Sequence, residues 1–189
     1  MRKFISGLLI VTGAALAGCE TAPPPAPQVV QPAGQPLPYR WTQGNAEKAH
    51  QAMIDTFGRA WLTPGNYLWA ATVPTEGSPK IVIDLLTQTA YAYQGDVLVG
   101  AASISSAKTG MSTPLGFWKV EEKKKMGRSR KYGDAPMPFM QRIDDHGIAL
   151  HGGDNPGYPA SHGCVRMPMK FAEKLCGLTK VGSKVVIEG

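Results

Sequence analysis

A cysteine and two histidines near the C-terminus are the residues of this sequence best suited to chemistry. The run Ser161-His162-Gly163-Cys164-Val165-Arg166 places a thiol beside a glycine and a histidine, and His151-Gly152 lies a short loop upstream. A free thiol ionises near about pH 8.5, so at neutral pH it needs a neighbouring base before it attacks a carbonyl. We therefore interpret Cys164 as a nucleophile and His151 as its base.

The segments around these residues predict how they meet. His151 ends the apolar run 147–150, which is typical of a strand, and the Gly- and Pro-rich loop 152–159 turns the chain back towards Cys164. Gly163 leaves space for a substrate carbonyl close to the backbone. The N–H groups of Gly163 and Cys164 are then candidates for an oxyanion hole.

A metal site is the alternative from a different class. Two histidines and a cysteine are also zinc ligands, but a fourth ligand at a standard spacing is missing. Asp154 is the only nearby candidate, and the sequence has no Cys-x-x-Cys pair. We therefore expect thiolate chemistry with no metal and no cofactor.

The elements that position these residues are mostly strands. The apolar spacing predicts a helix from Asn45, as its cap, to about Trp61, and a second helix from Pro168 to Cys176 that Gly177 stops. Between them, and once after the second helix, lie short runs rich in β-formers, punctuated by Gly and Pro. The predicted strands are 81–84, 90–93, 97–99, 101–105, 117–122, 137–142, 148–151 and 184–187. This pattern indicates a sandwich or partial barrel.

The N-terminus predicts export and a tether. Arg2 and Lys3 precede a short apolar stretch, and the run Leu16-Ala17-Gly18-Cys19 resembles a bacterial lipobox, in which Cys19 would be lipidated. Glu20 after that cysteine favours the outer membrane, facing the periplasm. Seven prolines between residues 21 and 38 predict an extended spacer. We divide the chain into a signal peptide (1–18), a lipidated tether (19–40), an N-terminal helical extension (41–78) and a catalytic domain (79–189).

The charge of the chain and its export limit the partners that we expect. The formal net charge is +6, and a cluster of lysines and arginines lies between residues 119 and 131. This cluster is interpreted either as a solvated loop or as a basic flap attracted to acidic peptidoglycan or lipid phosphates. Nucleic acid is not an expected partner, because an exported chain without a base-reading module does not meet it. Cys176 is interpreted as a small buried residue, not as half of a disulfide.

Several motifs in order resemble the L,D-transpeptidase (YkuD-like) catalytic domain. The resemblance covers most of residues 79–188, and its motifs are His151-Gly152, the run 161–166, the hairpin 81–93, the segment 108–116 with Thr113-Pro114-Leu115-Gly116, and the closing run 181–187. It implies a mostly β, sandwich-like domain with few short helices, preceded here by the N-terminal helix.

The resemblance also implies roles for single residues. Cys164 would attack a peptidoglycan stem peptide to form a thioester, and His151, oriented by the carbonyl of Gly152, would take the thiol proton. His162 and the backbone of Gly163 would line the oxyanion pocket. The expected substrate contacts are Arg166, Ser161 and Tyr158, and the segment 123–138 would form a lid.

Three outcomes stay open. An amine that resolves the thioester would give cross-links or attach an acceptor, and water would instead make the protein an L,D-carboxypeptidase or endopeptidase. A non-catalytic wall-binding lipoprotein on the same fold is the third reading. The sequence favours an enzyme, because a binding protein has no need to keep both Cys164 and His151. It does not indicate the oligomeric state.

Overall fold

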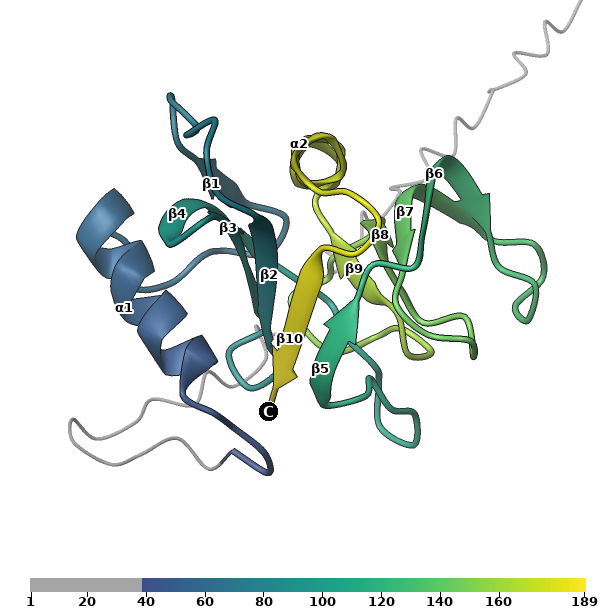
Figure 1. The fold of residues 1–189 in the computed structure, drawn as a ribbon. Helices are drawn as coiled ribbons and strands as arrows, with labels where there is room; N and C mark the ends of the chain where they lie inside the picture. Colours follow the sequence, from purple (N-terminus) through teal and green to yellow (C-terminus); the bar gives the residue numbers. More distant parts are fainter. Residues whose placement is uncertain (1–38) are drawn as a thin grey trace, which may run out of the picture.

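The computed structural model describes residues 39–189, which form two β-sheets and two helices (Figure 1). The predictions for the signal peptide, the lipidated Cys19 and the proline-rich tether lie outside these residues. In chain order the elements are α1 (Asn45–Phe57), β1 (Tyr67–Trp69), β2 (Pro79–Asp84), β3 (Thr89–Gln94), β4 (Val97–Ser103), β5 (Gly116–Lys119), β6 (Glu122–Arg128), β7 (Pro136–Arg142), β8 (Ala149–Gly152), β9 (Val165–Met167), α2 (Met169–Leu178) and β10 (Lys184–Glu188).

The strands form a six-stranded sheet, in the order β1-β4-β3-β2-β10-β5, and a four-stranded sheet, in the order β6-β7-β8-β9. Neighbouring strands are antiparallel except for β2 with β10 and β8 with β9. This arrangement confirms the predicted mostly β, sandwich-like fold. Both parallel pairs bring together segments far apart in the sequence, and the second pair carries the candidate nucleophile and base.

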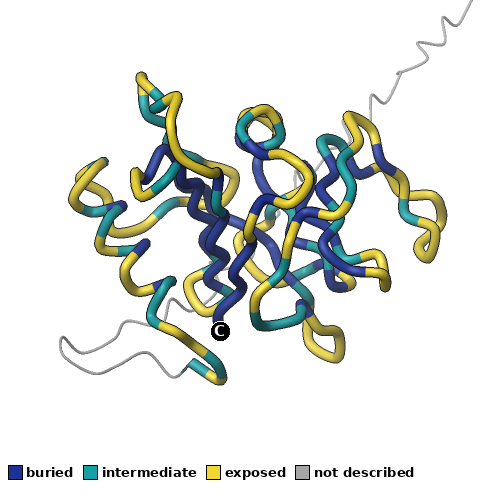
Figure 2. The backbone as a smooth tube through the Cα atoms, in the orientation of Figure 1, coloured by how far each residue is buried: buried dark blue, intermediate teal, exposed yellow. Residues whose placement is uncertain are grey.

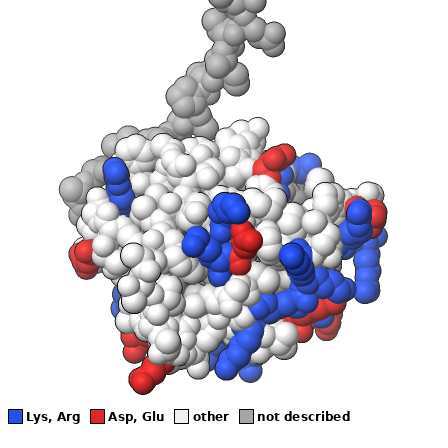
Figure 3. All heavy atoms as spheres, turned by 90° about the horizontal axis from the view of Figure 1, so that it is seen from above, with Lys and Arg blue, Asp and Glu red and all other residues white. Residues whose placement is uncertain are grey.

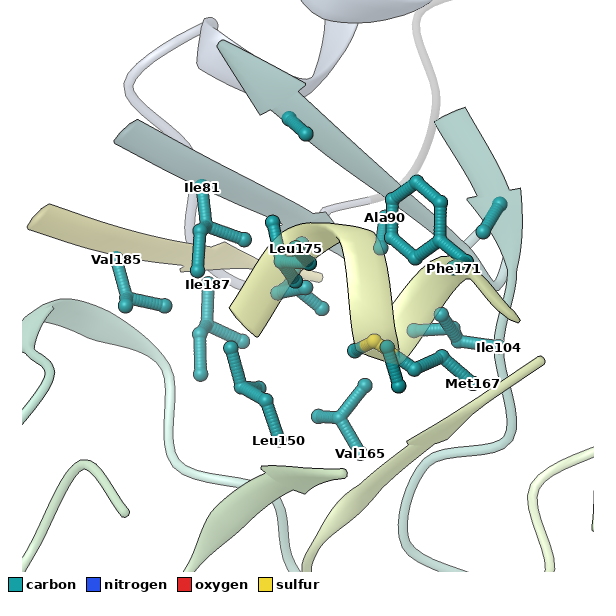
Figure 4. Close-up of a cluster of buried hydrophobic side chains, with 14 of the residues drawn as sticks. Ile81, Ala90, Ile104, Leu150, Val165, Met167, Phe171, Leu175, Val185 and Ile187 are labelled. Carbon is teal, nitrogen blue, oxygen red and sulfur yellow. The ribbon is translucent and has the colours of Figure 1, made fainter. Parts of the chain in front are cut away.

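The hydrophobic core lies between the sheets and is closed by α2. Alternate residues of β2 and β10 face inwards and meet alternate residues of β8 and β9, while one side of α2 completes the cluster (Figure 4). The buried backbone runs through the middle of both sheets, and the exposed positions lie in the connecting loops, on the outer sides of the helices and along β6 (Figure 2). The core residues include Ile81, Ile83, Leu150, Val165, Met167, Phe171, Leu175, Val185 and Ile187.

The N-terminal segment is part of the same body. Helix α1 packs its buried Ala46, Ala49 and Met53 on the face of the six-stranded sheet opposite the core, and β1 adds a strand beside β4. The extension predicted as helical therefore also supplies an edge strand.

The start and end of α1 differ from the prediction. Asn45 is the first helical residue, and Gly44 at the N-cap makes no side-chain capping bond. The carboxylate of Glu188 caps the helix instead, from the far end of the chain, and accepts the N–H of Ala46 at 2.8 Å. The helix stops at Phe57, not near Trp61, because Gly58 adopts a left-handed conformation.

Other boundaries also differ from the prediction. The two strands expected between residues 97 and 105 are one continuous strand, β4, and the single strand expected at 117–122 is interrupted between β5 and β6. Strands β1, β6 and β9 were not predicted. Helix α2 runs past Gly177 to Leu178, so this glycine does not stop it. No helix within residues 39–189 is long and apolar enough to cross a membrane.

Candidate active site

The parallel pairing of β8 with β9 brings the candidate base and nucleophile to one face of a sheet. Leu150 pairs with Val165, and His151 pairs with Arg166. Leu150 and Val165 point into the core, so His151 and Arg166 face the opposite side. Cys164 immediately precedes β9. It is two residues from Arg166, so strand alternation points both side chains to the same face. A two-residue offset across adjacent strands separates the Cα atoms of Cys164 and His151 by about 8 Å, within reach of their side chains.

The ring of His151 is held with its free nitrogen available as a base. The side chain is 7% exposed, and its Nδ1 lies 2.8 Å from the carbonyl oxygen of Gly152. A carbonyl only accepts, so Nδ1 carries the proton and Nε2 is unprotonated in the neutral ring. Burial lowers the pKa of His151, the charge of Arg166 acts in the same direction, and the bond to Gly152 opposes both. The imidazole is therefore neutral at neutral pH.

The thiol of Cys164 is also protonated at rest. It is half-buried, and its Sγ lies 3.7 Å from the carbonyl oxygen of Gly147. Burial raises the pKa of the thiol, while a hydrogen bond with the Ala149 backbone and the charge of Arg166 partly offset that effect. Neutral thiol and neutral imidazole form the resting pair, so proton transfer must accompany attack on a substrate.

Gly163 occupies a position that no other residue fits. Its φ is 139°, and a Cβ on it would lie 2.5 Å from Ile148 Cδ1 and 3.1 Å from the carbonyl oxygen of Ser112. Thr113 fixes the same turn, because its hydroxyl donates to the Gly163 carbonyl at 2.8 Å and accepts the N–H of Ala107 at 3.1 Å. Thr113 therefore supports residues 161–164, which we call the catalytic turn.

Ser161, which the sequence suggested as a substrate contact, holds the turn from the other side. It is 5% exposed, and its hydroxyl donates to the Cys164 carbonyl at 2.5 Å. The same hydroxyl accepts the N–H of Gly163 at 3.1 Å. That N–H was expected to serve an oxyanion hole but is already committed, so the N–H of Cys164 is the remaining backbone donor beside the sulfur.

Arg166 has a free donor inside the site. Its Nη2 donates to the Ser105 hydroxyl at 3.2 Å, whereas its buried Nε has no hydrogen-bond partner within residues 39–189. Ser105, which the sequence gave no reason to select, also donates to the carbonyl of Tyr158 at 2.8 Å. The Tyr158 ring itself is 53% exposed. An unpaired buried guanidinium N–H is suited to an anionic ligand group.

His162 is exposed and covered on one side by an aromatic ring that the sequence did not identify. The rings of Tyr132 and His162 are stacked, with centroids 4.4 Å apart and an interplanar angle of 25°. Tyr132 lies in the tip between β6 and β7, so the segment expected as a lid is a long hairpin whose tip contacts the catalytic turn.

The backbone at Phe139 departs from regular strand geometry on the inner side of this hairpin. Phe139 has a φ of 54°, and its pair with Lys125 is missing from an otherwise unbroken register between β6 and β7. Met137 and Met140, which regular alternation would place on opposite faces, are both buried in one cluster with Ala149 and against Cys164. Met137 and Met140 thus form an apolar wall beside the nucleophile.

Cations gather on the same hairpin (Figure 3). Of its lysines and arginines, Lys124 pairs with Glu122 and Arg128 with Asp134. Lys123 donates to the carbonyls of Cys176 and Thr179 at the end of α2, a position that a cation stabilises. Within the part of the chain described, no group of three or more His, Cys, Asp or Glu side chains is placed to hold a metal.

A sequence model of the YkuD family, described as the L,D-transpeptidase catalytic domain, matches residues 78–187. The chain belongs to the L,D-transpeptidase catalytic-domain family. The match spans β2 to β10 and includes all the residues of the site above, while α1 and β1 lie outside it. No curated protein matches the chain.

Solved L,D-transpeptidase structures share the fold. One from Stackebrandtia nassauensis is 24% identical, with a TM-score of 0.55, and the match covers 62% of this chain and 58% of that one. One from Xylanimonas cellulosilytica is 25% identical, with a TM-score of 0.54 and coverages of 62% and 64%. One from Mycobacterium smegmatis is 17% identical, with a TM-score of 0.55 and 59% of each chain covered. The chain thus spans about three fifths of the length of these L,D-transpeptidases.

Proposed function

We propose that this protein is an L,D-transpeptidase that acylates Cys164 with a peptidoglycan stem peptide and passes the acyl group to an amine. The observation that carries the proposal is the parallel β8–β9 register, which sets a buried neutral His151 and the Cys164 thiol on one face. A thiol with an oriented imidazole is the arrangement that nucleophilic acyl transfer requires.

In the acylation step, Nε2 of His151 takes the thiol proton as Sγ forms a bond to the carbonyl carbon of the stem peptide. The N–H of Cys164 receives the charge that develops on the carbonyl oxygen. Collapse of the tetrahedral species breaks the peptide bond, and the imidazolium returns its proton to the leaving amine of the terminal residue. The product is a thioester on Cys164.

The substrate is held by groups around the nucleophile. We assign the Arg166 guanidinium to a carboxylate of the stem peptide, because Arg166 lies on the same face as His151. The wall of Met137 and Met140 and the exposed Tyr158 supply apolar contact. Ser161 and Thr113 act as positioning residues, because their hydroxyls contact only the backbone of the site and its flanking loop.

In the second step an acceptor amine attacks the thioester, with His151 again as the base. Water in place of the amine would make the protein a hydrolase with the same intermediate. The stack of Tyr132 on His162 brings the hairpin tip to the turn that carries Cys164. We favour the amine, because a tip that closed over Cys164 would limit the access of water.

Mass spectrometry of muropeptides incubated with the purified protein tests this function. New dimers that the Cys164→Ala variant does not form would support transpeptidation, and shortened monomers alone would indicate a hydrolase. Binding to peptidoglycan without any new product would support the non-catalytic reading and overturn the proposal.

We further propose that the protein is anchored in the outer membrane through a lipid on Cys19 and faces the periplasm. The lipobox-like run at residues 16–19 supports this location. Metabolic labelling with a fatty-acid analogue tests it: label that disappears in the Cys19→Ser variant would support it, and equal label in both proteins would contradict it.

A further inference from the structure

Three lysines form a row across the six-stranded sheet. Lys184 of β10 pairs with Lys80 of β2 on one side and with Lys119 of β5 on the other. Paired residues of neighbouring strands project from the same face, so the three side chains lie next to one another. Adjacent strands are about 4.8 Å apart, so the row spans about 10 Å between its outer Cα atoms.

This row has no compensating charge. None of the three lysines has a carboxylate within 4.0 Å among residues 39–189. Lys80 lies over the Tyr93 ring, 4.6 Å from its centroid, which leaves its charge in place. Like charges directly opposite each other destabilise a sheet. Because the row of lysines costs folding stability, we interpret it as a site for an anionic partner.

An exposed aromatic residue, Phe117, and a half-buried one, Trp41, lie beside the lysines. Phe117 is two residues from Lys119 on the same face of β5, and it is 66% exposed. Trp41 packs edge-on against Phe117, with ring centroids 5.4 Å apart. In Figure 1, α1 lies over the β2–β4 side of this sheet. Phe117, Lys119 and Lys184, on β5 and β10, are exposed.

The orientation of this face separates it from the catalytic chemistry. Side chains alternate along β2 and β10, so Lys80 and Lys184 point away from the core, on the α1 side of the six-stranded sheet. Cys164 and His151 lie on the outer face of the other sheet, across the core. A substrate at Cys164 is therefore not the natural occupant of the lysine row.

We propose that Lys80, Lys119, Lys184, Phe117 and Trp41 form a docking surface for an anionic phospholipid membrane. Lysines with neighbouring aromatic rings are the composition that binds headgroup phosphates and the interfacial region together. The described chain begins at Tyr39, two residues before Trp41. A domain docked in this way turns its catalytic face away from the membrane.

Vesicle sedimentation tests the surface. The full chain with Cys19→Ser, which excludes acylation at that residue, is mixed with vesicles that contain about 30% phosphatidylglycerol in phosphatidylcholine, or with phosphatidylcholine alone. We expect binding to the anionic vesicles, loss of that binding at high salt, and a roughly 100-fold weaker affinity for K80Q/K119Q/K184Q. F117S should weaken binding with the lysines intact.

A matched variant, K48Q/K170Q/K174Q, removes the same charge from exposed positions on the two helices and should bind as the parent does. The K80Q/K119Q/K184Q variant should unfold at the same temperature as the parent or a higher one, because the like charges are gone. Equal vesicle binding by the parent and this variant would overturn the proposal. So would lysine-dependent binding to purified peptidoglycan in place of vesicles.

Discussion

The hydroxyl of Thr113 donates to the carbonyl of Gly163 at 2.8 Å and so ties the segment before β5 to the catalytic turn. Thr113→Val keeps the shape but leaves the Gly163 carbonyl and the Ala107 N–H without this partner. We expect a loss of about 1–3 kcal/mol in the free energy of unfolding and slower acylation of Cys164. Thr113→Ser should restore both, as denaturant unfolding and single-turnover rates would show; equal behaviour of the Val and Ser variants would contradict this role.

Tyr132 covers His162, and its removal should change the fate of the thioester. In Tyr132→Ala we expect a larger share of hydrolysed product relative to cross-linked dimer, because water gains access to the site. Tyr132 is a partly exposed tip residue, so the free energy of unfolding should change by less than about 0.5 kcal/mol. Tyr132→Phe keeps the ring and is the control. An unchanged product ratio in the alanine variant would mean that the hairpin tip does not exclude water.

Glu188 joins the last strand to the first helix. The bonds from the starting residues of α1 and the turn before it hold the pKa of this carboxylate below 4.5, although its burial alone would raise the pKa. Its stabilising effect is therefore complete above about pH 4.5 and is lost as the pH falls through the lowered pKa. Glu188→Gln should cost about 1–3 kcal/mol at neutral pH.

Urea unfolding at neutral and acidic pH checks this prediction. The difference between the parent and Glu188→Gln should shrink in acid. Glu47→Gln, in the exposed first turn of α1, is the matched control and should show a smaller loss. A loss for Glu188→Gln that does not change with pH would contradict a role for its charge.

The fall of kcat/KM at low pH should follow the protonation of His151. Its pKa lies below the ordinary value of 6.5, because burial disfavours the imidazolium. The base must be neutral, so kcat/KM should hold down to about pH 6.5 and fall only below it. A profile that already declines well above pH 7 as the pH is lowered would contradict this assignment.

The sequence was sufficient for the elements whose signals are local. The alternating strands around Ile83 and Tyr91 and the spacing of Cys164 with His151 led to the correct fold and family. The N-terminal boundary of α1 could not be predicted in the same way, because its cap, Glu188, is 142 residues from Ala46. Local propensity carries no information about such a partner.

The positions of several site residues also depend on long-range contacts. The sequence places Ser161 beside the nucleophile, and only the structure shows that the turn at Gly163 directs its hydroxyl to the backbone. Tyr132 directly follows a run of lysines and arginines, so the sequence indicates a charged loop there and gives no sign of the aromatic contact with His162. The positive φ of Phe139, between Met137 and Met140, has no signal in the sequence, because that residue is not a glycine.

Intact-protein mass spectrometry of acyl-enzyme formation tests the central claim, that His151 activates Cys164. With a stem tetrapeptide, the parent protein should gain an acyl group that maps to Cys164 and not to Cys176, the other cysteine in the described chain. His151→Ala should form it about 10²- to 10⁴-fold more slowly, and His162→Ala should lose less. Acylation of His151→Ala at the parent rate, or an adduct on Cys176, would contradict the mechanism.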